Sequence, residues 1–143
     1  MTAAVAAVGG LAACSSNEPN HPSQASVTIN GNTVASNQTV TCAQQANNLP
    51  GADPEWYWTI AVGDRDVSGI KATLNGSTDK LTAESVNIVN LGGFTGTYSR
   101  NDGGEASASF GSETFTISGT ANGFNTYTPN EPASATFKIV ASC

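Results

Sequence analysis

Most of the chain beyond Ser26 alternates apolar and polar side chains with a period of two residues. In EWYWTIAV, residues 55–62, one face would carry Trp56, Trp58, Ile60 and Val62. Such alternation is typical of strands with one buried and one solvated face. The pattern recurs in GIKATLNG (69–76), GEASASF (104–110), ETFTIS (113–118) and SATFKIVASC (134–143). It predicts half-buried strands, and no segment shows a convincing helical period.

Short clusters rich in glycine and asparagine separate these segments. Gly111-Ser112 is a candidate two-residue type II′ hairpin loop, and Asn30-Gly31-Asn32 is predicted to turn the first hairpin. The segment from Ala43 to Asp53 shows no clear pattern, so we interpret it as a loop with room for one helical turn. Further turns are predicted at Asn75-Gly76, Gly92-Gly93 and Asp102-Gly103-Gly104.

The strand pattern predicts an all-β fold of eight or nine short strands. Its architecture would be an antiparallel sandwich or a strongly twisted sheet that closes on itself. With 143 residues, of which 38% are hydrophobic and 11% charged, the chain can build one modest core. Three parts are expected: a signal peptide at 1–13, a flexible tether at 14–25 and a β domain at 26–143.

The charge argues against two classes of partner. The formal net charge is −6, and the five basic residues are dispersed singly. A nucleic-acid binder needs clustered positive charge, so we expect no nucleic-acid partner. A polybasic patch for anionic lipids is absent from the sequence as well. The bases are Arg65, Lys71, Lys80, Arg100 and Lys138.

The first residues resemble an export signal. Residues 2–13 are small and apolar, too short to span a bilayer, and of the length of a signal-peptide core. Leu11-Ala12-Ala13-Cys14 resembles the lipobox of bacterial lipoproteins, which implies a diacylglycerol thioether on Cys14 and cleavage before it. The first basic residue is Arg65, so the signal peptide lacks its usual charged start and we interpret it as truncated. The alternative is a leader in which Cys14 is incidental.

A polar stretch follows Cys14. SSNEPNHPSQAS, residues 15–26, has two prolines and no apolar residue before Ala25. Such a composition cannot bury enough surface to fold, so it predicts a disordered tether. The tether would hold a domain within a few nanometres of a membrane. Two or three acyl chains would give a stable anchor, whereas one gives marginal residence.

The remaining cysteines are predicted to pair. If Cys14 carries lipid, Cys42 and Cys143 remain of the three cysteines. Each shares a strand face with apolar residues, where a buried bridge could form. The bridge would close a loop of about 100 residues, which in the chain-entropy treatment stabilises the fold by roughly 4.7 kcal/mol. Disulfides persist in oxidising compartments, which agrees with export. The alternative is two separate buried thiols.

Candidate chemistry is sparse. The one histidine, His21, lies in the tether, so we expect neither a catalytic triad nor a histidine metal site in the β domain. We therefore predict no enzyme activity, no metal site and no cofactor. Trp56 and Trp58 are the best candidates for a binding feature. They either pack in the core or line an apolar cleft for a lipid or glycolipid.

Several segments together resemble the mycobacterial lipoprotein antigen family, the LpqH-like lipoproteins. The resemblance runs from Cys14 to Cys143 and departs in NNLPGADPEWYWTIAV (47–62), which is richer in aromatics than expected of the best-known member. Besides the lipobox, it rests on SVTINGNTVASNQTVTC (26–42), GGEASASFGSETFTISGTANGF (103–124) and SATFKIVASC.

The resemblance implies a surface antigen anchored by lipid to the cell membrane, on the extracytoplasmic side of the envelope. Its acylated amino terminus would be sensed by host lipoprotein receptors of the Toll-like class. Ligand transport is also entertained for the family, and no catalytic residues come with it. Two hypotheses therefore stand: an anchored antigen without a small ligand, or a binding module that carries a lipid or another hydrophobic ligand.

Overall fold

A computed structural model describes residues 23–143, which form nine strands and one short 3₁₀ helix, η1. This confirms the all-β prediction. Among the described residues, no helix is long and apolar enough to cross a membrane. The elements are β1 (Gln24–Ile29), β2 (Asn32–Asn47), β3 (Glu55–Asp64), β4 (Ser68–Ser77), β5 (Lys80–Leu91), β6 (Phe94–Ser99), η1 (Arg100–Asp102), β7 (Ala106–Gly111), β8 (Thr114–Asn125) and β9 (Thr128–Ser142).

All strand pairs are antiparallel, and the sheet closes on itself. The order is β6-β5-β4-β3-β2-β1-β9-β8-β7, with an additional pairing between β6 and β8. One edge of β8 serves two partners, because its residues 114–119 pair with β7 and its residues 122–125 pair with β6. We call the short β6–β8 ladder the seam. Of the two predicted architectures, the closing twisted sheet is the one observed.

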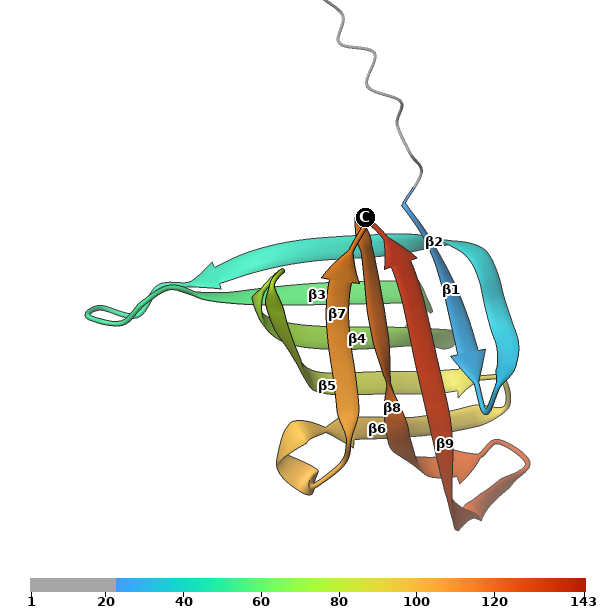
Figure 1. Ribbon diagram of the computed structural model, residues 1–143. Coiled ribbons are helices and arrows are strands. Elements are labelled where there is room, and N and C mark those ends of the chain that lie inside the picture. Colours follow the sequence, from blue (N-terminus) through green and yellow to red (C-terminus); the bar gives the residue numbers. More distant parts are fainter. Residues whose placement is uncertain (1–22) are drawn as a thin grey trace, which may run out of the picture.

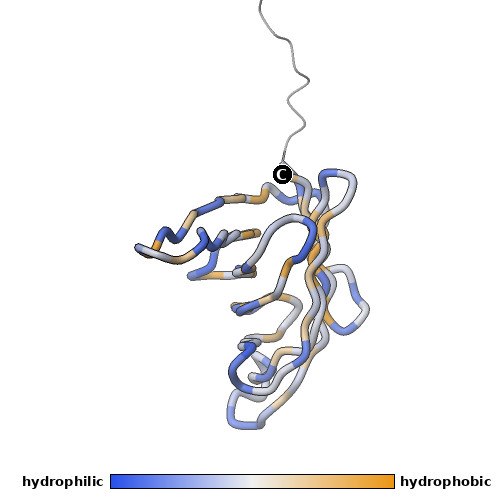
Figure 2. The backbone as a smooth tube through the Cα atoms, turned by 60° about the vertical axis from the view of Figure 1, so that its left-hand side comes forward, coloured by the Kyte–Doolittle hydropathy of each residue, from blue (hydrophilic) through white to orange (hydrophobic). Residues whose placement is uncertain are grey.

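The closed sheet folds into two layers whose strands cross. In Figure 1, β2 to β6 run across the molecule, while β1, β7, β8 and β9 run steeply over them. Figure 2 shows the layers from another side. The layers enclose one apolar core, in which Ile60 of β3, Ile117 of β8 and Ile139 of β9 have no exposed surface. The alternation seen in the sequence thus marks the inward faces of both layers.

Strand β2 passes from one layer to the other. Its residues 32–39 pair with β1, and its residues 40–47 pair with β3. Within the first stretch the register with β1 shifts twice, on either side of Val27, and Asn37 takes a positive φ of 52°. An extra residue in one strand bends it and strengthens its twist, which explains how β2 turns the corner.

The interpretation of Ala43 to Asp53 as a loop is wrong in its first half. Residues Ala43–Asn47 belong to β2 and pair with Thr59–Glu55 of β3. All five of these β2 residues are exposed, and the last two lie beyond the point at which β3 pairs with β4. Because both faces meet solvent, the sequence needs no apolar alternation, and the usual strand signal is missing. Residues 48–54 form the connecting loop.

Two predicted turns lie elsewhere than expected. Gly111 pairs with Thr114, so the β7–β8 loop is Ser112-Glu113, with φ of 52° and 61°. Positive φ at both positions is the type I′ geometry rather than type II′. Gly76 lies inside β4, and the following turn is at residues 78–79. A side chain at position 76 would collide with the Lys80 carbonyl, so this glycine permits a close approach.

Three other turns form where the sequence predicts them. Asn30-Gly31 turns the first hairpin with φ of 50° and 79°, and Gly92-Gly93 turns the β5–β6 hairpin with φ of 60° and 75°. Both are two-residue loops of the kind that suits right-handed strand twist. Gly103, also with positive φ, ends η1 in the loop before β7.

Candidate functional site

A disulfide joins Cys42 of β2 to Cys143, the last residue. Their Cα atoms lie 6.1 Å apart, across a sequence separation of 101 residues. The bond sits where β2 leaves β1, just after the hydrogen bond from the Val40 amide to the Ser23 carbonyl. It therefore ties the diverging part of β2 to the end of β9. The predicted pairing of these two cysteines is the one the structure contains, but the expected burial is wrong, because Cys143 follows the end of β9 and is exposed and Cys42 is half-buried.

The described chain begins at the same place. Gln24 pairs with Thr39 of β2 on one side and with Ser142 of β9 on the other. Figure 1 shows the start of β1 beside the C-terminal end. We call this region, with the disulfide, the anchor corner. Strand β1 begins two residues before Ser26, where the β domain was expected to start. The predicted signal peptide, Cys14 and most of the tether lie outside the described residues.

Trp58 takes part in core packing. Its ring centroid lies 5.2 Å from that of Phe115 on β8, and Phe110 of β7 lies 4.7 Å from Phe115. Its indole Nε1 donates a hydrogen bond to the Gly76 carbonyl at 3.2 Å. These contacts satisfy both the apolar body and the polar edge of the side chain. They agree with the first of the two interpretations offered for this residue.

Trp56 lies in a different environment. The pairing of β3 with β4 runs from Asp64 back to Tyr57, which lies opposite Asn75. Beyond it, β2 and β3 continue alone as a two-stranded projection, visible at the left of Figure 1. We call residues 46–56 the arm. Trp56 lies on the arm opposite Ala46, and 40% of its surface is exposed.

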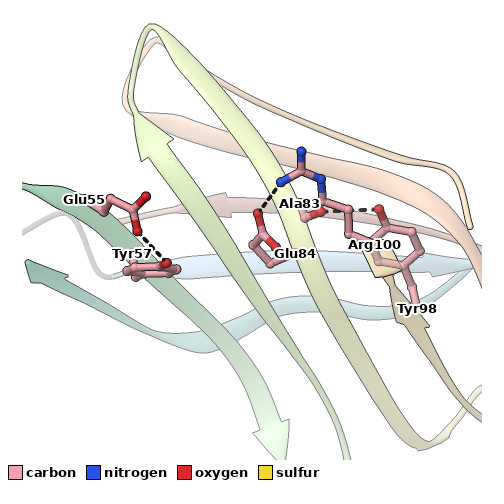
Figure 3. A network of polar contacts seen from close by, with 6 residues as sticks. All are labelled: Glu55, Tyr57, Ala83, Glu84, Tyr98 and Arg100. Carbon is pink, nitrogen blue, oxygen red and sulfur yellow. Dashed lines mark hydrogen bonds and ion pairs between the residues drawn. The ribbon is translucent and has the colours of Figure 1, made fainter. Parts of the chain in front are cut away.

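The other face of β3 carries polar groups near the arm. Tyr57 donates a hydrogen bond from Oη to Oε2 of Glu55 at 2.9 Å (Figure 3). This hydrogen bond raises the pKa of Tyr57, and desolvation and the negative charge of Glu55 add to the effect. Glu55 and Tyr57 are two residues apart in a strand, so they share a face that Trp56 does not. The sequence pattern gives no sign of this pair.

Figure 3 also shows two contacts between β5 and the segment around β6 and η1. Arg100 forms an ion pair with Glu84, with Nη1 and Oε1 2.9 Å apart. Tyr98 is buried, and its hydroxyl donates to the Ala83 carbonyl at 3.3 Å. The ion pair is exposed and so contributes little, whereas the buried tyrosine fixes η1 and β6 against β5.

Shallow hollows on the outer faces offer little chemistry. One of about 510 Å³ lies over β2 to β4, beside the turn that contains Arg65 and Asp66. In that turn Asp64 Oδ1 accepts a hydrogen bond from the Asp66 amide at 2.9 Å, so this carboxylate stabilises the local backbone. Within residues 23–143, no group of three or more histidine, cysteine, aspartate or glutamate side chains could hold a metal ion.

The chain is similar to a known protein family. Residues 18–143 match the protein family described as the Mycobacterium 19 kDa lipoprotein antigen. The chain belongs to the mycobacterial 19 kDa lipoprotein antigen family. The match covers every described strand. The predicted resemblance to mycobacterial lipoprotein antigens is therefore confirmed.

Three similar mycobacterial proteins also carry the name lipoprotein. A putative lipoprotein of Mycobacterium indicus pranii is 42% identical over 93% of this chain and 88% of its own length. A putative lipoprotein of Mycobacterium avium subsp. hominissuis is 40% identical over 99% of this chain and 94% of its own. The probable lipoprotein LppE of Mycobacterium tuberculosis is 30% identical over 98% of this chain and 92% of its own.

Proposed function

We propose that this member of the 19 kDa lipoprotein antigen family is a non-catalytic surface antigen, anchored by acyl chains on Cys14 at the extracytoplasmic side of the cell membrane. The observation that carries the proposal is the Cys42–Cys143 disulfide. The bond uses two of the three cysteines, and Cys14 at the end of the lipobox is the third. A bond of this kind also persists in an exported protein.

The fold supports this role by its placement of the chain ends. Residue 23 leads into the anchor corner, next to the disulfide and to the last strand. An anchor on Cys14 would therefore pull on the part of the domain that is covalently cross-linked. We further propose that the acylated terminus is what host lipoprotein receptors of the Toll-like class recognise. Nine residues separate Cys14 from β1, so a receptor could bind the acylated residue without contacting the strands.

The test is the Cys14→Ser variant expressed in a mycobacterial host. Wild-type protein should fractionate with membranes and carry acyl chains in the mass spectrum of its amino-terminal peptide. The variant should appear in the medium or cytosol and lose activity on Toll-like-receptor reporter cells. Ser16→Ala, two residues away, is the matched control and should behave like wild type. Unchanged membrane fractionation of Cys14→Ser would refute the anchor.

Carriage of a lipid or glycolipid is the second candidate function, and the exposed Trp56 is the observation in its favour. The packing of Trp58 against Phe115 speaks against a cleft lined by both indoles. Native mass spectrometry of protein isolated from envelope extract separates the two functions. A bound lipid that is lost in Trp56→Ala would support carriage, and a spectrum of unliganded protein alone would count against it.

A further inference from the structure

The arm has two chemically different faces. Trp56 and Ala46 form a cross-strand pair on one face. Glu55 lies on the other face, where it accepts a hydrogen bond from Tyr57, the residue that follows the arm. At the tip, Leu49 is 59% exposed, and its carbonyl accepts the Ala52 amide in a tight turn. The arm thus presents a tryptophan and a leucine to solvent, and Glu55, one of its two acidic residues, lies on the face opposite Trp56.

Neither Trp56 nor Leu49 belongs to the apolar core or to the side chains packed against it. The core takes the indole of Trp58, which packs on Phe115, while Trp56 lies past the last β3–β4 pair. Two of the four large apolar side chains that are exposed in the described residues, Leu49 and Trp56, thus lie on the arm. Grouped exposed apolar side chains mark interaction sites, whereas single ones do not. Tryptophan in particular favours the boundary between lipid headgroups and acyl chains, where its ring is buried and its N–H stays wet.

The arm also lies within reach of the anchoring membrane. From Thr39, which pairs with Gln24 at the anchor corner, to Asn47 the strand rises about 26 Å. Residues 15–23 can span at most about 30 Å. A chain attached to a bilayer through Cys14 can therefore lay its arm on that bilayer. Because attachment makes the contact intramolecular, a weak interaction is sufficient.

We propose that the arm docks on the lipid bilayer to which the chain is anchored, with Trp56 and Leu49 at the membrane interface. The inference rests on the proposed lipid anchor at Cys14. Residues 46–56 contain no lysine or arginine and include Asp53 and Glu55. The contact is therefore apolar, and it is stronger on zwitterionic than on anionic lipid. Docking would hold the closed sheet on its side, with one face toward the membrane.

The test uses the full acylated protein in phosphatidylcholine vesicles with brominated acyl chains, which quench tryptophan on contact. The chain has only two tryptophans. Trp56→Phe therefore leaves the core residue Trp58 as the internal reference. We expect the wild type to lose most of its Trp56 emission and the remaining spectrum to match that of Trp56→Phe. Leu49→Ser should reduce the quenching, because it removes the second apolar side chain of the tip.

A matched control places the reporter elsewhere. Tyr127, in the β8–β9 turn, is 93% exposed. The double variant Trp56→Phe/Tyr127→Trp thus carries an exposed tryptophan away from the arm, and it should not be quenched. Equal quenching of reporters at 56 and 127, or none at 56, would overturn the inference. A blue shift of Trp56 that grows with protein density on unbrominated vesicles would point to a second copy of the chain and would also overturn it.

Flotation of the same vesicles separates this inference from the proposed function. If the protein floats with the vesicles but Trp56 is not quenched, the arm does not dock and the anchor stands. If the protein made in the mycobacterial host carries no acyl chain and does not float, the anchor at Cys14 is wrong and the docking falls with it. Quenching together with flotation supports both.

Discussion

Cys42 and Cys143 hold together the corner at which β2 leaves β1, whereas the seam between β6 and β8 closes without a covalent bond. The disulfide spans 101 residues of sequence. At the seam, residues 94–97 of β6 pair with residues 125–122 of β8. Thr126 adds to the seam, because its amide donates to the Gly93 carbonyl at 2.8 Å and its hydroxyl donates to Asn90 Oδ1 at 2.9 Å. The fold is thus closed once by a covalent bond and once by a short ladder.

Removing the disulfide should lower the free energy of unfolding. In Cys42→Ala/Cys143→Ala the unfolded chain regains the freedom that a large closed loop denies it, and we expect a loss of about 3 to 5 kcal/mol. Urea unfolding of wild type and variant, each with and without reductant, measures this. Reductant should destabilise only the wild type. Alkylation of Cys42 in unreduced, exported protein would contradict the bond.

The seam depends on two glycines that lie opposite each other, Gly96 and Gly123. A side-chain carbon at 123 would collide with the Thr95 carbonyl, and one at 96 would lie 2.7 Å from the Asn122 carbonyl. We expect Gly123→Ala to destabilise the domain by about 2 to 3 kcal/mol, since the seam must shift to admit the methyl group. Gly111→Ala, with open space around it, is the control. Matching unfolding midpoints for the two variants would show that the seam is not tight.

The two tryptophans should differ sharply in their effect on stability. Trp58→Ala removes a ring that packs on Phe115 and leaves the Gly76 carbonyl without its donor, so we expect a loss of about 3 to 5 kcal/mol. Trp56→Ala should cost less than about 1 kcal/mol, because the side chain is exposed on the arm. Thermal and urea unfolding report both values. A large loss for Trp56→Ala would mean that the arm is part of the core.

The hydrogen bond between Tyr57 and Glu55 should be visible in a pH titration. The pKa of Tyr57 is raised, chiefly because its hydroxyl donates to the carboxylate. Folded protein therefore keeps this proton at a pH at which the unfolded chain has lost it, so stability declines as the pH rises through the tyrosine range. Glu55→Gln should lower the pKa of Tyr57 in an NMR titration of its ring. Asp66→Asn, in a distant turn, should leave that titration unchanged.

Much of the fold follows from alternation along the sequence. The inward residues of β9, from Ala135 to Ala141, are the ones that the period of two selects, and all four are buried. The last part of β2, residues 43–47, could not be found in this way, because a strand solvated on both faces has no reason to alternate. The seam was equally hidden, since Gly96 and Gly123 show their role only once their strands are side by side.

The residues of the candidate site also differ in whether the sequence pattern reveals their roles. Pairing of Cys42 with Cys143 could be predicted because both share faces with apolar neighbours, and a bridge needs only that they meet. The roles of Trp56 and Trp58 could not be separated, because both lie on the same face of β3 and differ only in where β4 ends. That end depends on Gly76 and the turn after it, which the sequence places three residues too early.

The position of β1 determines how the domain carries mechanical load. Strand β1 is paired along both edges, with β2 and with β9, and the chain enters it at the anchor corner. A pull transmitted through residue 23 acts along the strand axis, so it shears both ladders together instead of opening one bond after another. Cys42 and Cys143 flank this point with a covalent bond. Tension on the proposed lipid anchor would therefore reach two paired ladders and a covalent bond before it reached the seam or the arm.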